Sequence, residues 1–169
     1  VALVAIAVAL YIARGLSRFD SEMATAISLS TPGRTEAARG SFTTIAHDYP
    51  DRAAPHVFLS RMAREDNPPD MNTARQELVT AIRLEPTYEP AQREMGIFQL
   101  AAQNPTLARN FLVRAVQLAP GDSAAQGYLG CALMRLNRVD EAQRFLTRAG
   151  TGTWSSCAAP STPAAPVNP

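Results

Sequence analysis

The stretch "LARNFLVRAVQLAP", residues 107–120, decides the fold class of this chain. Its small and apolar residues Ala108, Leu112 and Ala115 follow one another at steps of four and three, which places them on one face of a helix. Pro120 comes next, and a proline ends such a helix. The stretch therefore predicts one amphipathic helix that packs through a narrow apolar face and is followed by a turn.

The same pattern recurs along the chain. "TARQELVTAIRLEP" begins at residue 73 and "EAQRFLTRAGTGTW" at residue 141, so that Ala74, Ala108 and Ala142 are spaced by 34 residues. A further copy, "AARGSFTTIAHDYP", contains Ala38, which lies 36 residues before Ala74. This difference indicates that one loop has two extra residues. In the last copy, Trp154 stands where the other copies have proline.

Two glycines predict how the helices pair. Gly96 and Gly130 each lie 12 residues before a pattern alanine, Ala108 and Ala142. A residue without a side chain at this position lets a preceding helix approach the following one closely. Each repeat is therefore predicted to be two antiparallel helices joined by a short turn.

The period of 34 residues, the small residues and the closing proline resemble the tetratricopeptide repeat family. The resemblance is good for residues 87–120 and 121–150, fair for 53–86 and weak for 19–52. It implies an all-α fold, in which about three and a half helix–turn–helix repeats stack into an α-solenoid.

The first thirteen residues, Val1–Ala13, include no charged side chain and no side-chain amide. As a helix they span about 20 Å, against about 30 Å of hydrocarbon in a bilayer. Because the sequence begins without methionine, we predict a transmembrane anchor over residues 1–18 whose first part lies upstream; a signal-peptide remnant and a buried helix are the alternatives. The residues predicted to contact membrane lipid are Val1, Ala2, Leu3, Val4, Ala5, Ile6, Ala7, Val8, Ala9, Leu10, Tyr11 and Ile12.

Three segments follow from these patterns: the anchor over 1–18, repeats over 19–150, and an extended Pro/Ala-rich tail over 151–169. The predicted location is the bacterial inner membrane, crossed once, with the repeats in the periplasm. Arg14 and Arg18 argue weakly for the cytoplasmic side. The periplasmic choice follows the common arrangement of N-terminally anchored repeat proteins.

The resemblance also implies a function. The concave face of such repeats is lined by the first helix of each pair and binds protein segments. Arginines on this face would bind acidic groups of a partner in a bidentate geometry, or else lie on solvated helix faces. At the matching positions of this chain the groove residues are Val57, Arg61, Arg64, Arg93, Ile97, Leu100, Gly127, Cys131 and Met134.

Two features concern the end of the repeats. A disulfide between Cys131 and Cys157 would close a loop of roughly 25 residues and contribute about 3 kcal/mol, while the alternative is a packed cysteine and a free thiol. Trp154 is expected to cover the exposed apolar edge of the last helix.

Several function classes are disfavoured. The charges nearly balance, with 16 basic residues against 15 acidic, so no nucleic-acid surface is expected. His47 and His56 lack partners at metal-ligand spacing, and no nucleophile elbow or glycine-rich phosphate loop occurs. We therefore predict no enzyme, no metal or cofactor, and no small-molecule substrate.

The sequence thus predicts a non-catalytic, membrane-anchored scaffold. Its partners would be protein subunits of a larger bacterial membrane complex, respiratory or photosynthetic for example, in which it acts as an accessory, assembly or stabilising subunit. The alternative is a chaperone-like factor that binds extended peptides of transient envelope clients.

Overall fold

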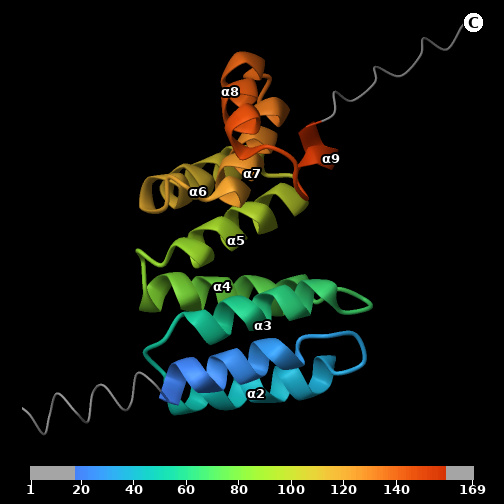
Figure 1. The fold of residues 1–169 in the computed structure, drawn as a ribbon. Coiled ribbons are helices and arrows are strands. Elements are labelled where there is room, and N and C mark those ends of the chain that lie inside the picture. The colour runs from blue at the N-terminus through green and yellow to red at the C-terminus, as the bar shows by residue number, and fades with distance from the viewer. Residues whose placement is uncertain (1–17, 159–169) are drawn as a thin grey trace, which may run out of the picture. The chain divides into compact units, whose positions relative to one another are not determined.

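The computed structural model describes residues 18–158, with side chains described up to residue 156. All the regular structure in this part of the chain is helical (Figure 1). A helix over residues 18–29 is followed by α2 (Thr35–Asp48), α3 (Ala54–Glu65), α4 (Met71–Leu84), α5 (Glu89–Ala101), α6 (Pro105–Leu118), α7 (Ser123–Arg135), α8 (Val139–Ala149) and α9 (Ser155–Ala158). The predicted all-α fold is confirmed.

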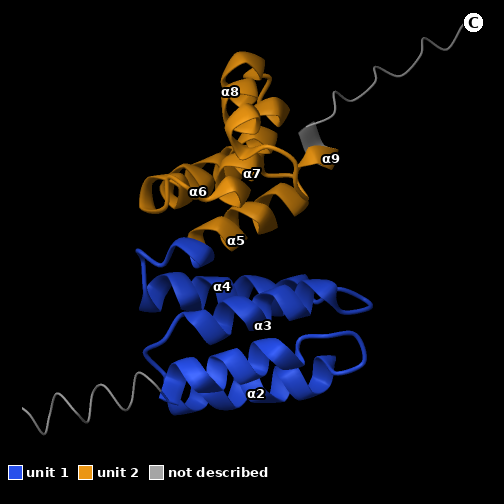
Figure 2. Cartoon of the chain, in the orientation of Figure 1, with its two compact units in different colours: residues 1–91 blue, residues 92–169 orange. Residues whose placement is uncertain are grey.

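The chain divides into two compact units, residues 1–91 and 92–169 (Figure 2). Within the first unit, α2 packs on α3 and α3 packs on α4. Within the second, α7 packs on both α6 and α8, and the short α9 also touches α7. Within each unit, these helices therefore pack on the helices that adjoin them in the chain, as expected for helix–turn–helix repeats.

The periodic alanines form the contact surface of the second helices. Ala38, Ala74, Ala108 and Ala142 are each 0% exposed. The residues four positions later in three of these helices, Phe42, Leu78 and Leu112, are 0% exposed as well. The face predicted from the steps of four and three is therefore the buried face in both units.

Three of these helices end in the same way. The backbone N–H groups of Tyr49, Glu85 and Ala119 each donate to the carbonyl oxygen four residues earlier, at 2.9 Å. A proline follows each of the three. The last copy differs, because α8 ends at Ala149 and Gly150 adopts a φ of +69°, which favours glycine. The chain therefore leaves this helix before the position at which the other copies have proline.

The two glycines noted in the sequence are sites of close helix approach. A Cβ atom at Gly96 would lie 2.4 Å from Cγ of Leu112, and one at Gly130 would lie 2.6 Å from Cγ of Leu146. Neither position has room for a side chain unless the neighbour moves. The predicted close packing of α5 on α6 and of α7 on α8 is confirmed.

The predicted transmembrane helix requires a correction. Within residues 18–158, no helix is both long and apolar enough to cross a bilayer. The transmembrane part of the predicted fold class, and the predicted single-pass inner-membrane location, are therefore not supported. The predicted anchor falls mainly on residues 1–17, which lie outside the described residues. The thirteen apolar residues at its start are by themselves too short to cross a bilayer.

Asp70 gives this fold a pH-dependent contribution to stability. It is the N-cap of α4, and its carboxylate accepts hydrogen bonds from the backbone N–H of Thr73 at 3.0 Å and from its hydroxyl at 2.6 Å. The hydroxyl and then the backbone hydrogen bond of Thr73 lower the pKa of Asp70 from its ordinary value. The stabilisation is therefore present above the unfolded-state pKa and is lost as the pH falls through the folded-state pKa.

Asp70→Ala is accordingly expected to unfold more easily than the wild type at neutral pH, with a difference that shrinks once the pH drops below about 4. Urea unfolding at a series of pH values measures this difference. Asp70→Asn is the matched control, since asparagine caps a helix without titrating. A difference that stays constant into the acid range would contradict the assignment.

Candidate functional site

The groove positions on α3 are only partly accessible. Val57 is 1% exposed and belongs to the core with Ala53, Ala81 and Ala91. Arg61 is half-buried, with its guanidinium carbon 5.4 Å from the centroid of the Phe58 ring. Arg64 is also half-buried. Two of the three predicted residues on this helix, both arginines, therefore reach the surface.

The groove positions on α5 hold this helix to α7. Arg93 forms an ion pair with the carboxylate of Asp122, the N-cap of α7. Leu100 is 5% exposed, and its carbonyl oxygen accepts a hydrogen bond from Arg135 at 2.6 Å. Ile97 is half-buried. Because Asp122 already balances its charge, Arg93 is less suited to holding an acidic partner than the sequence suggests.

Asp122 has two roles that substitutions separate. One carboxylate oxygen accepts from the backbone N–H groups of Ala124 and Ala125, at 2.7 and 3.1 Å, and the other faces Arg93. Asp122→Ala removes both the cap and the ion pair, and is expected to lower the free energy of unfolding by about 1 to 3 kcal/mol. Asp122→Asn keeps a cap and should lose less. Equal losses in urea unfolding of the two variants would show that the ion pair dominates.

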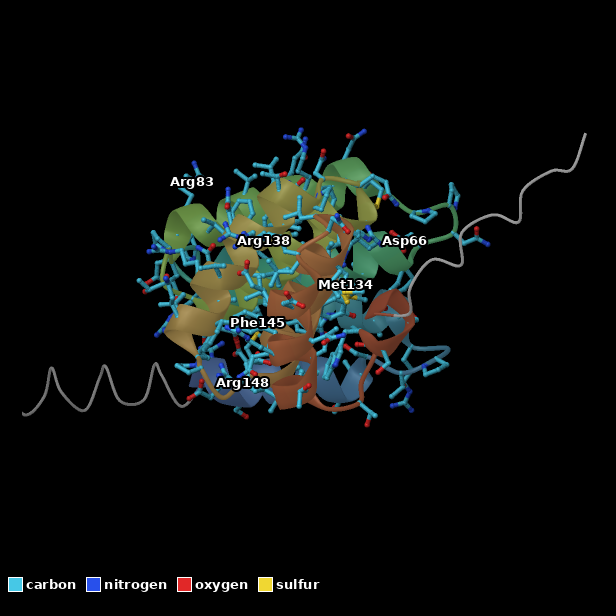
Figure 3. All side chains as sticks on the ribbon, turned by 90° about the horizontal axis from the view of Figure 1, so that it is seen from above. Asp66, Arg83, Met134, Arg138, Phe145 and Arg148 are labelled. Atoms are coloured by element: carbon cyan, nitrogen blue, oxygen red, sulfur yellow. The ribbon has the colours of Figure 1, made fainter. Side chains whose placement is uncertain are left out.

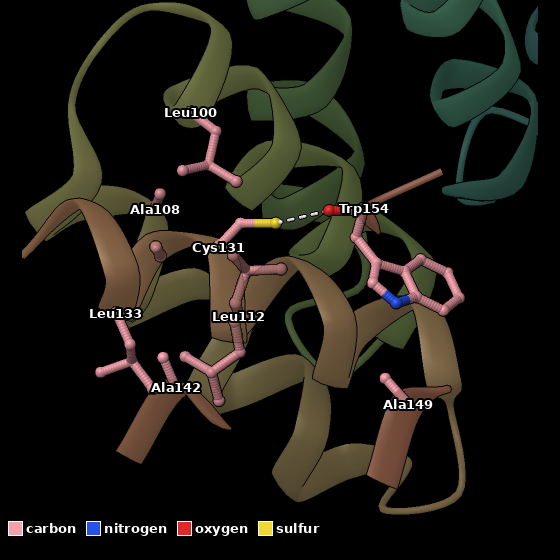
Figure 4. Packing of buried hydrophobic residues seen from close by; sticks show 10 residues of the cluster. Leu100, Ala108, Leu112, Cys131, Leu133, Ala142, Ala149 and Trp154 are labelled. Carbon is pink, nitrogen blue, oxygen red and sulfur yellow. Dashed lines mark hydrogen bonds between the residues drawn. The ribbon is translucent and has the colours of Figure 1, made fainter. Parts of the chain in front are cut away.

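The groove positions on α7 are covered by the chain itself. Residues 150–156, which we call the C-terminal strap, return from the end of α8 and lie on α7 (Figure 4). Gly127 is buried beneath the strap, and Cys131 is 0% exposed. Met134 is half-buried. Trp154 therefore lies on α7, the first helix of the last pair, and shares a buried cluster with Ala149 at the end of α8.

The strap is held by a small set of contacts. The Trp154 indole N–H donates to the carbonyl oxygen of Gly150 at 2.9 Å, and the side chain is 8% exposed. The ring lies edge-on to Tyr128, with centroids 6.1 Å apart. The hydroxyls of Tyr128 and Thr153 are 2.9 Å apart. The strap thus folds around its own indole and presents that ring to α7.

Cys131 lies beside the strap, with its Sγ 3.3 Å from the carbonyl oxygen of Trp154. Cys131 is disulfide-bonded, and the described residues include no free thiol. The side chain of Cys157 lies outside the described residues. The pairing of Cys131 with Cys157 therefore stays a prediction.

Titratable side chains within residues 18–156 do not converge on one site. His56 Nδ1 lies 2.7 Å from Glu77 Oε2, which links α3 to α4, and His47 Nδ1 lies 3.1 Å from Asp48 Oδ1. In this part of the chain, no group of three His, Cys, Asp or Glu side chains is placed to hold a metal ion. The two histidines thus make pairwise contacts and belong to no larger constellation.

Sequence reasoning missed the exposed arginines on three of the second helices, two on α4 in the first unit and three on α6 and α8 in the second. On α4, α6 and α8, the exposed charged residues are five arginines and one acid, Asp140. Figure 3 shows one of them, Arg83, pointing away from its helix. The signal was present in the helical spacing, but the resemblance directed attention to the first helices. The five arginines are Arg75, Arg83, Arg114, Arg144 and Arg148.

A hollow lies in the first unit, between the helix over residues 18–29 and α2. Its volume is about 590 Å³. Most of its lining is small, including Ser21, Thr25, Gly40 and Ser41, with Arg18 and two acidic side chains among the other residues. It offers room but no cluster of groups for chemistry.

Comparison with known proteins supports tetratricopeptide repeats. Residues 99–150 match the tetratricopeptide repeat family. This stretch runs from the last three residues of α5 to the end of α8. It contains Ala108, Ala142 and Gly130, on which the resemblance was based. Comparison with curated proteins gave no match.

Solved structures share the fold at low sequence identity. PilF of Pseudomonas aeruginosa is 18% identical with a TM-score of 0.69, over 78% of this chain and 59% of that chain. MamA of Desulfovibrio magneticus is 19% identical with a TM-score of 0.62, over 78% and 73%. Cut9, in a complex with Hcn1, is 20% identical with a TM-score of 0.69, over 78% and 26%. The chain thus spans 59% of the PilF structure's length, and these likenesses concern the fold.

Proposed function

We propose that the protein is a non-catalytic scaffold that binds other proteins through its helical repeats. In this role it acts as an accessory, assembly or stabilising component of a larger protein complex. The observation that supports the proposal most directly is the tetratricopeptide match over residues 99–150, within a fold whose repeat alanines are fully buried. Repeats of this kind use their conserved positions for stacking and leave their helix faces for partners.

The charged surface supports a partner with acidic groups. On α4, α6 and α8 the exposed charged side chains are five arginines and one acid, whereas α2 exposes Glu36 and Asp48. On α4, Arg75 and Arg83 line a hollow of about 300 Å³ together with Val79, which is 49% exposed. Arginine binds carboxylates in a bidentate geometry, and an exposed apolar side chain beside it adds contact area. This arrangement suits a protein surface better than a small molecule.

Affinity purification of the tagged full chain from its source cells, with quantitative mass spectrometry, tests the proposal. We expect a small set of proteins at fixed stoichiometry that stays with the chain through gel filtration. Many clients at low occupancy would favour the chaperone-like alternative. Recovery of the chain alone would contradict both. Arg75→Glu with Arg83→Glu is expected to weaken partner recovery. Arg34→Glu, at an exposed position before α2, is the control for added negative charge alone.

A further inference from the structure

We propose that a disulfide between Cys131 and Cys157 locks the C-terminal strap onto α7, and that reduction of this disulfide by a dithiol releases the strap. The surface that the last repeat presents then depends on the redox state of its surroundings, because α7 is covered while the disulfide is closed and uncovered once it is open. The inference concerns this chain alone and does not depend on the proposed scaffold function.

The chain offers one partner for Cys131. Cys131 is disulfide-bonded, and Cys157 is the other of the two cysteines in the sequence. The Sγ atom of Cys131 lies 3.3 Å from the carbonyl oxygen of Trp154 (Figure 4), and residue 157 follows three residues later within α9, which touches α7. Three helical residues advance the chain by about 4.5 Å, a step of the size that a disulfide spans between two Cα atoms. The geometry therefore supports a pairing of Cys131 with Cys157.

The strap meets α7 through the Trp154 ring and the Thr153 hydroxyl. The ring lies over Gly127, where a Cβ atom would be 2.3 Å from its Cγ, and the hydroxyl is 2.9 Å from that of Tyr128. The indole N–H donates within the strap, to the carbonyl oxygen of Gly150, and so adds nothing to the hold on α7. A second covalent tether raises the effective concentration of the ring at α7. The disulfide therefore raises the fraction of chains in which the strap is docked.

Release is a thiol–disulfide exchange. One thiolate of the dithiol attacks the disulfide and forms a mixed disulfide with one cysteine, and the other cysteine leaves as a thiolate. The second thiol of the dithiol then attacks the mixed disulfide, so that the chain gains two electrons and two protons and the dithiol is oxidised to its own disulfide. Because Cys131 is 0% exposed, its sulfur is shielded while the strap is docked. Docking and the closed disulfide thus favour each other, by the same factor in each direction.

Peptide mapping of the air-oxidised full chain, together with its fluorescence, tests the lock. We expect a peptide pair joined through Cys131 and Cys157 within one chain. Dithiothreitol should shift the emission of Trp154, the single tryptophan, to longer wavelengths with stronger acrylamide quenching, and speed hydrogen exchange of residues 150–156 at least about tenfold. Cys157→Ser should resemble the reduced wild type and should not respond to dithiothreitol. A disulfide between two copies, two free thiols, or unchanged emission after complete reduction would overturn the proposal.

The coupling between docking and the disulfide is tested in dithiothreitol redox buffers. Trp154→Ala removes the ring that docks, so its disulfide should be half-reduced at a ratio of reduced to oxidised dithiothreitol at least about tenfold lower than in the wild type. Thr151→Ala, at an exposed position of the same strap, is the matched control and should leave this ratio unchanged. Equal ratios for the wild type and Trp154→Ala would overturn the proposal. If Trp154→Ala does not fold, the comparison with Cys157→Ser decides.

Discussion

Replacing Leu112 by alanine is expected to lower the free energy of unfolding by about 3 to 5 kcal/mol. Leu112 is 0% exposed and belongs to the core of the second unit. Its Cγ would lie only 2.4 Å from a Cβ atom at Gly96, so it fills the contact between α5 and α6. The cavity left by alanine cannot be refilled by Gly96, which has no side chain. Urea unfolding followed by far-UV circular dichroism measures the loss.

Leu107→Ala is the matched control, because Leu107 lies on the same helix and is 48% exposed. This control should change stability by less than about 0.5 kcal/mol. If the two variants lost equal stability, the periodic face of α6 would not be its packing face. That outcome would contradict the repeat register from which the fold is argued.

Replacing Trp154 by alanine is expected to cost about 3 kcal/mol, the lower end of the range for a buried aromatic ring. The ring is 8% exposed, lies against Tyr128 and covers Gly127 in the second unit. The value is at the low end because the ring belongs to a short strap at the end of the repeats, where the structure relaxes more easily than in a helix core. Far-UV circular dichroism follows the unfolding, since the variant lacks tryptophan fluorescence.

Trp154→Phe provides the comparison for this variant. Phenylalanine keeps an aromatic ring over Gly127 but removes the N–H that donates to Gly150. It should therefore retain more than half of the stability that alanine loses. A loss below about 1 kcal/mol for Trp154→Ala would mean that the strap is not docked on α7 in solution.

The repeats could be predicted well because each one is determined by residues that lie close together in the sequence. The steps between Ala108, Leu112 and Ala115 select one helix face, and that face is fully buried. Gly96 and Gly130 predict close helix pairs because a glycine within a helix leaves room for a neighbouring helix to approach its backbone. These features need no knowledge of distant segments.

The surroundings of the predicted groove residues were less predictable, because they depend on contacts between residues far apart in the sequence. Arg93 and Asp122 are 29 residues apart, and no local pattern joins them. The strap depends on Gly150, which ends α8 early and turns the chain back to α7. The spacing of the repeats predicts that Trp154 replaces proline, but it does not predict which helix the ring then covers.

Hydrogen–deuterium exchange of the chain, free and bound to the partner recovered by affinity purification, shows whether the helical repeats bind that partner. If the repeats are the scaffold, backbone exchange should slow on binding within α3 to α8, with local changes at α7 and the C-terminal strap. Unchanged exchange throughout residues 54–156, with protection elsewhere in the chain, would show that the partner does not bind the repeats and would contradict the account.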